Sequence, residues 1–444
     1  MATRVCGASA GRAQLRGSGR AGLRPRNAGR PAARRGLRMN QRPLAGITVA
    51  DFTWLGAGSY TTRMLADFGA DVIKIESGAR LDSLRDARPF QGGVRGVNRS
   101  GYFADRNASK RSITLNLKTG EGCALARQLV RCSDVVANNF TPGTMEKFAL
   151  GYDAVRAFRP DIVYIAMSMH GQAGPQAQYL GYGLTIGAVT GLHHLCGLPD
   201  QEPAGTGTNF PDHVPNPAHA AFAILAALRH RRRTGQGQLI DMAQIEPTIA
   251  LLGPAVLDYT ANGHVAGRVG NQQIAGAPHG VYPCRGDDRW IALSATGQPA
   301  WAALRTVLAD PALDQDLRFA DVAARWQHRA ALDAALARST AHHDAHELAR
   351  RLQQHGVAAG PVQDAADVLL RDAQLQARQH WAYLDHPEMG RTVYGTLPLR
   401  MSRTPTGPLR PAPLLGQHSD EILREKLDLS DDDIAALRSR GVLQ

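Results

Sequence analysis

The stretch LAGITVADFTWLGAGSYTTRMLADFGADVIKIE, residues 44–76, contains the pattern that decides the fold. Two short runs with strand-like composition, at 46–52 and 71–76, flank a segment at 61–68 with helical spacing. The same alternation continues downstream, in strands expected at 112–117, 134–136 and 161–167 and a helix expected at 120–131. Strands and helices that alternate at this spacing predict an α/β fold with a mainly parallel sheet.

The composition is ordinary for a globular protein and excludes a disordered or fibrous chain. Apolar residues make up 43% and charged residues 20% of 444 residues, a length that predicts two domains. No apolar run approaches the roughly 20 residues that a membrane-spanning helix needs. The five cysteines are widely spaced, without a C-x-x-C pair. We therefore expect neither a disulfide framework nor a zinc site, and a reducing compartment fits best.

The net charge of +12 is concentrated in the first 38 residues. This leader contains ten arginines, no lysine and no acidic residue, which leaves +2 for residues 39–444. The folded part of the chain is therefore nearly neutral. Such a leader is typical of a mitochondrial transit peptide, and it also arises when a start codon is assigned upstream of the true one, here Met39. Because Ala, Arg and Gly usage suggests a GC-rich bacterial gene, we favour the second interpretation and expect a cytoplasmic bacterial protein.

Helix-end signals identify several further helices. Asn216 followed by Pro217 predicts a helix start with Asn216 as N-cap, and the basic run 229–233 followed by Gly235 predicts its end. A helical stretch at 299–355 indicates a smaller second domain. Near the C-terminus, the capping-box spacing predicts a last helix, with the signal residues Ser430, Asp433 and the terminator Gly441.

The histidine-rich segment 342–346 allows two interpretations. If one helix spans it, His342 and His346 lie one turn apart and could ligate a metal. We favour the alternative, in which Asp344 caps the following helix, the histidines are solvated and no metal is bound. The sequence also lacks a P-loop, a complete dinucleotide-binding fingerprint and a G-x-S-x-G elbow.

Eight short motifs recur in a fixed order, at residues 44–58, 65–76, 107–113, 139–143, 171–175, 234–238, 356–362 and 411–419. In this order and spacing the chain resembles the class III CoA-transferases, the CaiB/BaiF family. That family includes formyl-CoA transferase, carnitine CoA-transferase and the methylacyl-CoA racemases. The resemblance covers nearly everything from Leu44 to the C-terminus.

The resemblance implies a Rossmann-like large domain built from both chain ends, with an inserted smaller α+β domain, in an interlinked homodimer. On this basis we expect a leader at 1–38 and the first part of the large domain at 39–260. Linkers and the small domain are expected at 261–365, and the return to the large domain at 366–444.

The resemblance also implies the site residues. The family's nucleophilic aspartate falls on Asp212, which the residues alone would place as a turn residue among prolines. The positions that match the family's CoA contacts are Gly56, Ala57, Leu115, Leu117, Lys118, Asn139, Phe140, Lys147, Gly181 and Tyr182. Lys118 and Lys147 are candidate phosphate partners, although either could be an ordinary solvated lysine. The chain departs from the family pattern at Gly56, Ser59 and Ser77, where relatives carry glutamine, proline and arginine.

The expected activity is transfer of coenzyme A from an acyl-CoA donor to a free carboxylic acid, through an aspartyl-acyl anhydride and an aspartyl-CoA thioester. An aspartate of ordinary pKa is ionised at pH 7 and needs no partner base. The glycine-rich loop 267–276 is the candidate lid. The resemblance implies no permanently bound cofactor, and we expect no nucleic-acid or membrane partner.

Two other functions remain open. One is a 2-methylacyl-CoA racemase, which needs a histidine after the glycine at 181, where this chain has Tyr182. The other is a non-catalytic RNA- or CoA-binding module, suggested only by the leader and by the basic run at 229–233. That run lacks the interleaved aromatic residues of a nucleic-acid-binding patch. We therefore interpret it as the end of a helix.

Overall fold

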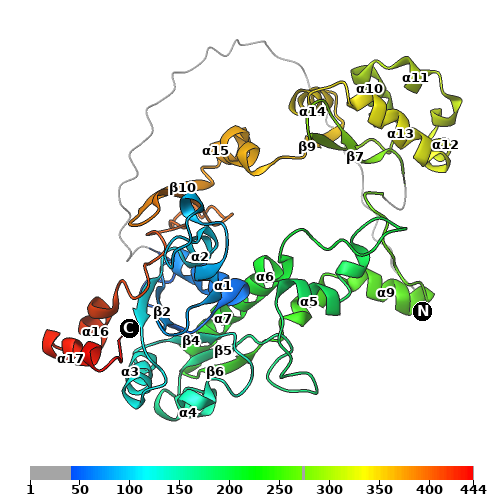
Figure 1. Ribbon diagram of the computed structural model, residues 1–444. Coiled ribbons are helices and arrows are strands. Elements are labelled where there is room, and N and C mark those ends of the chain that lie inside the picture. Colours follow the sequence, from blue (N-terminus) through cyan, green and yellow to red (C-terminus); the bar gives the residue numbers. More distant parts are fainter. Residues whose placement is uncertain (1–41, 273–275, 444) are drawn as a thin grey trace, which may run out of the picture. The chain divides into compact units, whose positions relative to one another are not determined.

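A computed structural model of the protein describes residues 42–272 and 276–443, so the arginine-rich leader lies outside the described residues. A six-stranded sheet organises the N-terminal half of the described chain (Figure 1). Its strands are β1 (Thr48–Asp51), β2 (Asp71–Glu76), β3 (Arg111–Thr114), β4 (Val135–Asn138), β5 (Val163–Ala166) and β6 (Gln238–Asp241). All neighbouring strands are parallel, in the order β3-β2-β1-β4-β5-β6. The predicted α/β fold with a parallel sheet is confirmed.

Helices cover both faces of this sheet. The main ones are α1 (Leu55–Asp67), α3 (Gly120–Arg131), α4 (Tyr152–Phe158) and α7 (Pro215–Thr234). Val49 of β1 packs in one core with Leu65 of α1 and Ile224 of α7. Ala50, the next residue, packs in the opposite core with Leu129 of α3. Successive residues of β1 therefore face different cores, and the strand is buried on both faces.

The C-terminal segment contributes to the core that contains α3. Its helices are α16 (Ser419–Leu427) and α17 (Asp431–Ser439), and Ile422 and Leu437 pack in that core. The backbone N–H of Asn116 donates to the carbonyl of Val442 at 2.9 Å. The predicted capping box of Ser430 and Asp433 is present at the start of α17.

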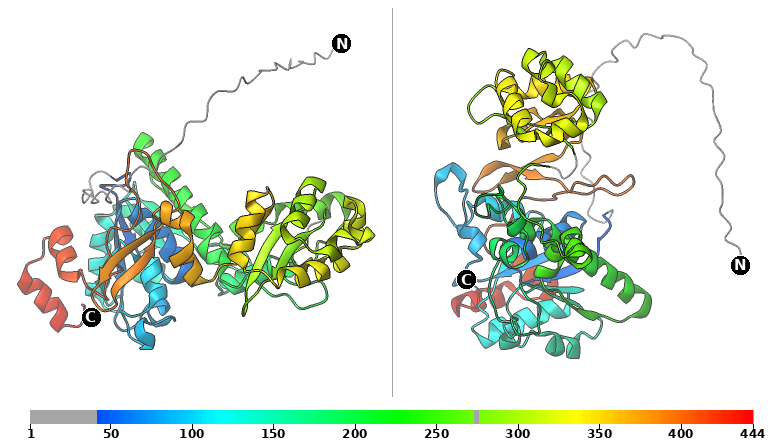
Figure 2. Two further views of the ribbon diagram at one scale, coloured as in Figure 1. Left: turned by 90° about the horizontal axis from the view of Figure 1, so that it is seen from above. Right: turned by 90° about the vertical axis from the view of Figure 1, so that its right-hand side faces the viewer.

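A second apolar core lies within residues 277–359. Three antiparallel strands form its sheet, β7 (His279–Pro283), β8 (Trp290–Ser294) and β9 (Ala358–Pro361). The helices around it, drawn in yellow tones in Figure 2, are α10 (Gln298–Leu308), α11 (Pro311–Asp314), α12 (Val322–Gln327), α13 (Arg329–Thr340) and α14 (Ala345–Gln354). The sequence predicted the helices but not the individual strands, because a strand such as Ala-Ala-Gly-Pro has little intrinsic β-propensity.

A two-stranded antiparallel hairpin, β10 (Trp381–His386) and β11 (Gly390–Gly395), forms a separate small sheet. Its Tyr394 packs with Leu84 and Phe103 in a further apolar cluster. The remaining α-helices are α2 (Gly101–Asn107), α5 (Gly183–Val189), α6 (Phe210–His213), α8 (Ile245–Ala250), α9 (Gly253–Asn262) and α15 (Ala373–Ala377). Within the described ranges, no helix is both long and apolar enough to cross a membrane.

Helix α7 ends as predicted but begins earlier. Gly235 terminates it with a φ of 75°, and its N–H donates to the carbonyl of Arg231. The prediction of Asn216 as N-cap is wrong, because Pro215 takes the first helical position. The Asn216 side chain is buried and donates instead to Oε1 of Gln244 at 3.3 Å. A tertiary contact therefore replaces the expected local cap.

The two histidines of the alternative metal site do not share a helix. His342 follows the end of α13, whereas His346 lies in α14. As predicted, Asp344 caps α14 by accepting from the backbone N–H groups of His346 at 3.1 Å and Glu347 at 3.0 Å. No group of three or more metal-ligating side chains occurs among the residues that the structure describes.

Candidate active site

The strand order places a topological switch point between β1 and β4. In doubly wound sheets, ligands bind beyond the carboxyl ends of the strands at such a point. Asn139, after β4, is joined to Trp54, after β1: its Oδ1 accepts from the Trp54 N–H at 2.8 Å and its Nδ2 donates to the Trp54 carbonyl at 2.7 Å. The rings of Phe140 and Trp54 meet edge to face, with 5.6 Å between their centroids. The predicted residues Asn139 and Phe140 thus lie beside the turn into α1, which contains Gly56 and Ala57.

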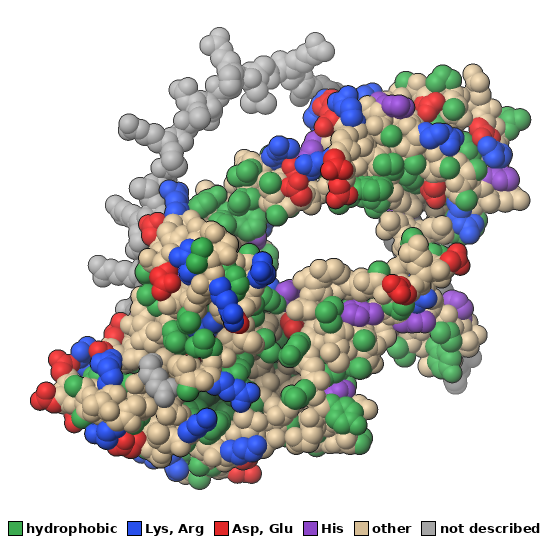
Figure 3. All heavy atoms as spheres, viewed as in Figure 1, with side chains coloured by type: hydrophobic (Ala, Val, Ile, Leu, Met, Phe, Trp, Pro, Cys, Tyr) green, Lys and Arg blue, Asp and Glu red, His purple; other side chains and the backbone are tan. Residues whose placement is uncertain are grey.

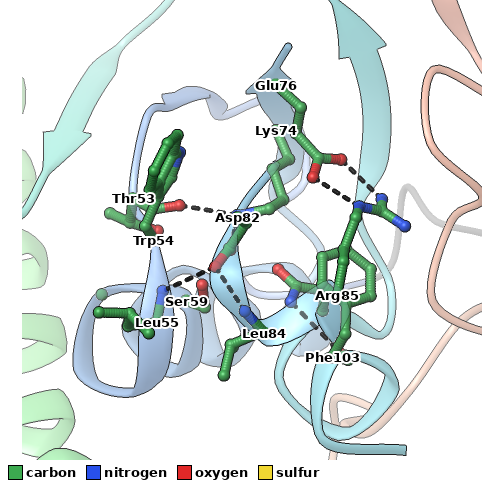
Figure 4. A network of polar contacts seen from close by, with 12 residues as sticks. Thr53, Trp54, Leu55, Ser59, Lys74, Glu76, Asp82, Leu84, Arg85 and Phe103 are labelled. Atoms are coloured by element: carbon green, nitrogen blue, oxygen red, sulfur yellow. Dashed lines mark hydrogen bonds and ion pairs between the residues drawn. The ribbon is translucent and has the colours of Figure 1, made fainter. Parts of the chain in front are cut away.

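A buried ionic network holds that turn in place (Figure 4). Oδ1 of Asp82 accepts from the backbone N–H groups of Leu55 and Leu84, both at 3.1 Å. Lys74 Nζ lies 3.0 Å from Oδ2 of Asp82 and donates to the carbonyl of Thr53 at 2.7 Å. The network stabilises Leu55 at a φ of 60°, a left-handed conformation that a leucine seldom adopts. Neither residue was predicted as a site residue: Lys74 lies within the motif at 65–76 but was given no role, and Asp82 belongs to no motif.

Asp212 lies on α6 against the start of α1. Its side chain is 3% exposed, and its Oδ2 accepts from the backbone N–H of Gly183 at 3.0 Å. Oδ1 is buried and has no hydrogen-bond partner among the described residues. A Cβ added at Gly56 would lie 2.8 Å from the Cβ of Asp212. The close approach explains why this position needs glycine in this chain.

Burial raises the pKa of Asp212 to about 6, although the Gly183 hydrogen bond and the charge of Arg106 both lower it. This corrects the expectation of an ordinary aspartate. At pH 7 the group is still mostly ionised, but its charge is incompletely stabilised. A desolvated carboxylate with one free oxygen is a stronger nucleophile than a solvated one.

A polar cluster missed by sequence analysis lies next to Asp212. The hydroxyl of Tyr102 on α2 is 2.7 Å from Nε2 of His213, and the Oγ1 of Thr208 is 3.2 Å from Nδ1 of the same ring. Burial lowers the pKa of His213 to about 4, so the imidazole is neutral at pH 7. Arg106, one turn after Tyr102, lowers the pKa of His213 as well. The only signal in the sequence was the four-residue spacing that places Tyr102 and Arg106 on the same face of one helix. This spacing indicates a site only once α2 is known to contact α6.

The predicted residues Gly181 and Tyr182 lead directly into α5, whose first residue is Gly183. Tyr182 is 58% exposed, whereas a Cβ on Gly181 would lie 2.5 Å from Sδ of Met169. These two residues therefore lie within a few residues of the N–H that binds Asp212. The histidine that the racemase alternative requires at 182 is replaced by this exposed phenol.

The other predicted CoA contacts lie after β3 and β4. Leu115 is fully buried, with its backbone N–H bonded to the carbonyl of Glu76 at 2.8 Å, so its side chain is part of the core. Leu117 is half-buried against the same core. Lys118 and Lys147 are exposed, and neither forms an ion pair with another described residue. Residues 273–275 of the loop 267–276 lie outside the described residues, so the lid stays a prediction.

Comparison with known proteins agrees with this fold. The model of CoA-transferase family III matches residues 44–419. Succinyl-CoA–D-citramalate CoA-transferase of Chloroflexus aurantiacus is 34% identical over 402 residues, covering 90% of this chain and 98% of that protein. Succinate–glutarate CoA-transferase of Agrobacterium fabrum is 34% identical over 86% of this chain and 95% of its own length. A solved CaiB/BaiF family protein from Brucella suis, 33% identical, covers 87% of this chain and 100% of its own with a TM-score of 0.80.

These similarities define the class of the protein as a CoA-transferase enzyme. Within that class, the chain belongs to CoA-transferase family III, the family that the eight motifs predicted.

Proposed function

We propose that the enzyme transfers coenzyme A from an acyl-CoA donor to a free carboxylic acid, with Asp212 as the covalent nucleophile. The single observation that carries this proposal is the hydrogen bonding of the Asp212 carboxylate. One of its oxygens is held by the Gly183 N–H, whereas the other is buried and unpartnered. The unpartnered Oδ1 is available to attack a carbonyl carbon.

In the first half-reaction, Oδ1 of Asp212 attacks the thioester carbonyl of the donor. The C–S bond breaks, coenzyme A leaves as the thiolate, and a mixed anhydride joins Asp212 to the acyl group. The thiolate then attacks the aspartyl carbonyl, which releases the donor acid as its carboxylate and leaves an aspartyl-CoA thioester.

In the second half-reaction, the acceptor carboxylate attacks that thioester and again displaces the thiolate. The thiolate attacks the acceptor's carbonyl carbon, which forms the new acyl-CoA and regenerates Asp212. The bridging oxygen, which came from the acceptor, remains on the aspartate. No proton needs to be transferred at any step, which agrees with an Oδ1 that has no hydrogen-bond partner among the described residues.

The N–H of Gly183 has a second role in this scheme. When the thiolate or the acceptor attacks the aspartyl carbonyl, negative charge develops on the aspartyl carbonyl oxygen. Where that oxygen is Oδ2, the Gly183 N–H, 3.0 Å away in the free enzyme, is already placed to donate to it. A donor fixed in advance stabilises an oxyanion without reorganisation of the site.

We place coenzyme A along the carboxyl ends of the central strands. The turn at Gly56 and Ala57, the Trp54–Asn139 pair and the Phe140 ring would border its pantetheine arm. Lys118 and Lys147 project from the connections after β3 and β4 and would bind its phosphates. Leu115 and Leu117 would contribute backbone and partial side-chain contacts, and Gly181 and Tyr182 would flank the acyl end.

We propose dicarboxylic acids as the acyl groups exchanged. The names of the relatives include succinyl-CoA, citramalate and glutarate, all derived from dicarboxylic acids. Succinyl-CoA is therefore the donor to test first.

We also propose that the working enzyme is a homodimer. Helices α5, α7 and α9 leave large apolar side chains exposed, among them Leu184 (59%), Phe222 (73%) and Leu257 (67%). Figure 3 shows apolar side chains at the surface where Figure 1 places α9. A monomer rarely leaves this much apolar surface in water, and burial against a second copy would remove it. Light scattering at micromolar concentration should give the mass of two chains.

The test of function is CoA exchange from succinyl-CoA to a panel of mono- and dicarboxylic acceptors, read by mass spectrometry. We expect new acyl-CoA species and loss of activity when hydroxylamine is added together with donor, with the modification on Asp212. Asp153, an exposed aspartate of α4, should stay unmodified. Absence of any exchange, or modification elsewhere, would refute the proposal.

A further inference from the structure

Arg106 has hydrogen-bonding capacity that the protein itself does not fill. Its Nη1 pairs with Oδ2 of Asp105 at 2.8 Å, and only 12% of its side chain is exposed. Its Nε is buried and lacks a partner among the described residues. A guanidinium offers five N–H donors, so a single neighbouring carboxylate leaves most of them available.

Two aromatic rings and a carboxylate surround the Arg106 guanidinium. The guanidinium lies over the ring of Tyr60, 4.3 Å from the centroid, and 5.8 Å from that of Tyr102. Asp105 is also held by Arg63, with 3.0 Å between Nη1 and Oδ1, so it does not depend on Arg106 for a partner. Stacking fixes the plane of the guanidinium while its N–H edges stay free to point at an anion.

This cation is close to the nucleophile. Its charge lowers the pKa of Asp212 and that of His213, the next residue. Tyr102, on the same helix, reaches His213 at 2.7 Å and so joins α2 to α6. The candidate phosphate partners Lys118 and Lys147 follow β3 and β4, whereas the helix that carries Arg106 contacts the helix that carries Asp212.

We propose that Arg106, beside Tyr102, is a subsite for the second carboxylate of a dicarboxylic acyl group that is bound at Asp212. The inference rests on the proposed function and adds the residue that selects the substrate. A planar guanidinium binds a carboxylate through two N–H donors at once, which neither a lysine nor a neutral side chain can do. An acyl group that ends in a methyl would leave those donors unpaired.

The test compares succinyl-CoA with butyryl-CoA, which has the same chain length but no second carboxylate, at one fixed acceptor. In a ping-pong reaction, kcat/KM for the donor reports only the first half-reaction. Arg106→Gln should lower kcat/KM for succinyl-CoA about 30-fold, the size expected for a lost charged hydrogen bond, and leave butyryl-CoA nearly unchanged. Arg106→Lys should restore part of the preference. The matched control is Arg127→Gln, because Arg127 also stacks on an aromatic ring, Phe158, but on α3.

The outcomes separate two kinds of failure. If the wild-type enzyme transfers CoA but prefers butyryl-CoA, or if Arg106→Gln lowers both donors equally, the subsite is refuted and the proposed function survives. If the wild-type enzyme transfers from neither donor nor any other acyl-CoA, the proposed function itself fails. Thermal unfolding of each variant shows whether a loss of activity reflects a loss of fold.

Discussion

Two regions of buried charge border the same turn into α1, and they are built in opposite ways. On one side, every charge has a partner: Lys74 lies 3.0 Å from Asp82, and Lys110 lies 2.9 Å from Asp51. Burial lowers the pKa of Lys110 to about 8, yet the lysine remains charged at pH 7 beside its aspartate. All four side chains are almost fully buried.

On the other side, Asp212 is just as deeply buried but has one hydrogen-bond donor and a free oxygen. The contrast separates buried charges that fix the fold from a buried charge that we propose takes part in catalysis. Paired charges hold the backbone of the turn, whereas an incompletely paired carboxylate costs stability and gains reactivity.

The largest effect is expected from Asp212→Asn. The change keeps the shape of the side chain but removes the proposed nucleophile, so kcat should fall by about 10⁴-fold, the order found when a residue of a catalytic unit is removed. CoA binding should persist, as measured by calorimetry. An unchanged kcat would show that another group forms the covalent bond.

On the paired side, Lys74→Met should destabilise the fold. It leaves the buried Asp82 carboxylate without its cation, which costs about 3–5 kcal/mol in the free energy of unfolding by urea. Arg95→Met is the matched control, because Arg95 and Asp86 form an ion pair at the surface, and it should change stability little. Equal changes in the free energy of unfolding for the two variants would show that the buried ion pair contributes no more to stability than the surface pair.

Gly56→Ala tests the contact between the two regions. The new methyl group would lie 2.8 Å from Cβ of Asp212 and would displace the carboxylate. A misplacement of this kind lowers kcat by about 100-fold. Gly120→Ala is the control, because nothing lies within 4 Å of the added methyl group there. Full activity of Gly56→Ala would show that the position of Asp212 is not critical.

The smallest effect concerns stability and pH. Because burial raises the pKa of Asp212 from 3.8 to about 6, the folded state holds this proton more tightly than the unfolded state. The contribution of Asp212 to stability therefore falls as pH rises from about 4 to 6, by at most about 3 kcal/mol. Asp212→Asn should be more stable than wild type at pH 7, and the difference should close towards pH 4 in urea unfolding. A variant less stable at pH 7 would contradict this account of the pKa.

The fold could be predicted from the sequence to the extent that its signals are local. The alternation that begins at 44–76 gave the parallel sheet, and Ser430, Asp344 and Gly235 marked helix ends where the structure has them. Helix α1 begins at Leu55 and not at 61. Its first turn is rich in glycine, which disfavours a helix locally, and the helix start depends on the hydrogen bond that the Leu55 N–H donates to Oδ1 of Asp82.

The site was less predictable for a physical reason. Resemblance pointed to Asp212, but the raised pKa and the free oxygen depend on what surrounds it in space. Tyr102, Arg106 and His213 lie on segments separated by about a hundred residues of sequence, which no local pattern connects. Only the packing of α2 near α6 shows that they share one site.

The central claim is that Asp212 exchanges an oxygen with the acid in every turnover. The most direct test uses an acceptor acid labelled with ¹⁸O in its carboxylate, followed by digestion and mass spectrometry of the peptide that contains Asp212. The account predicts that one heavy oxygen appears on Asp212, because the bridging oxygen of the second anhydride stays with the aspartate. A fully active enzyme whose Asp212 peptide remains unlabelled would contradict it.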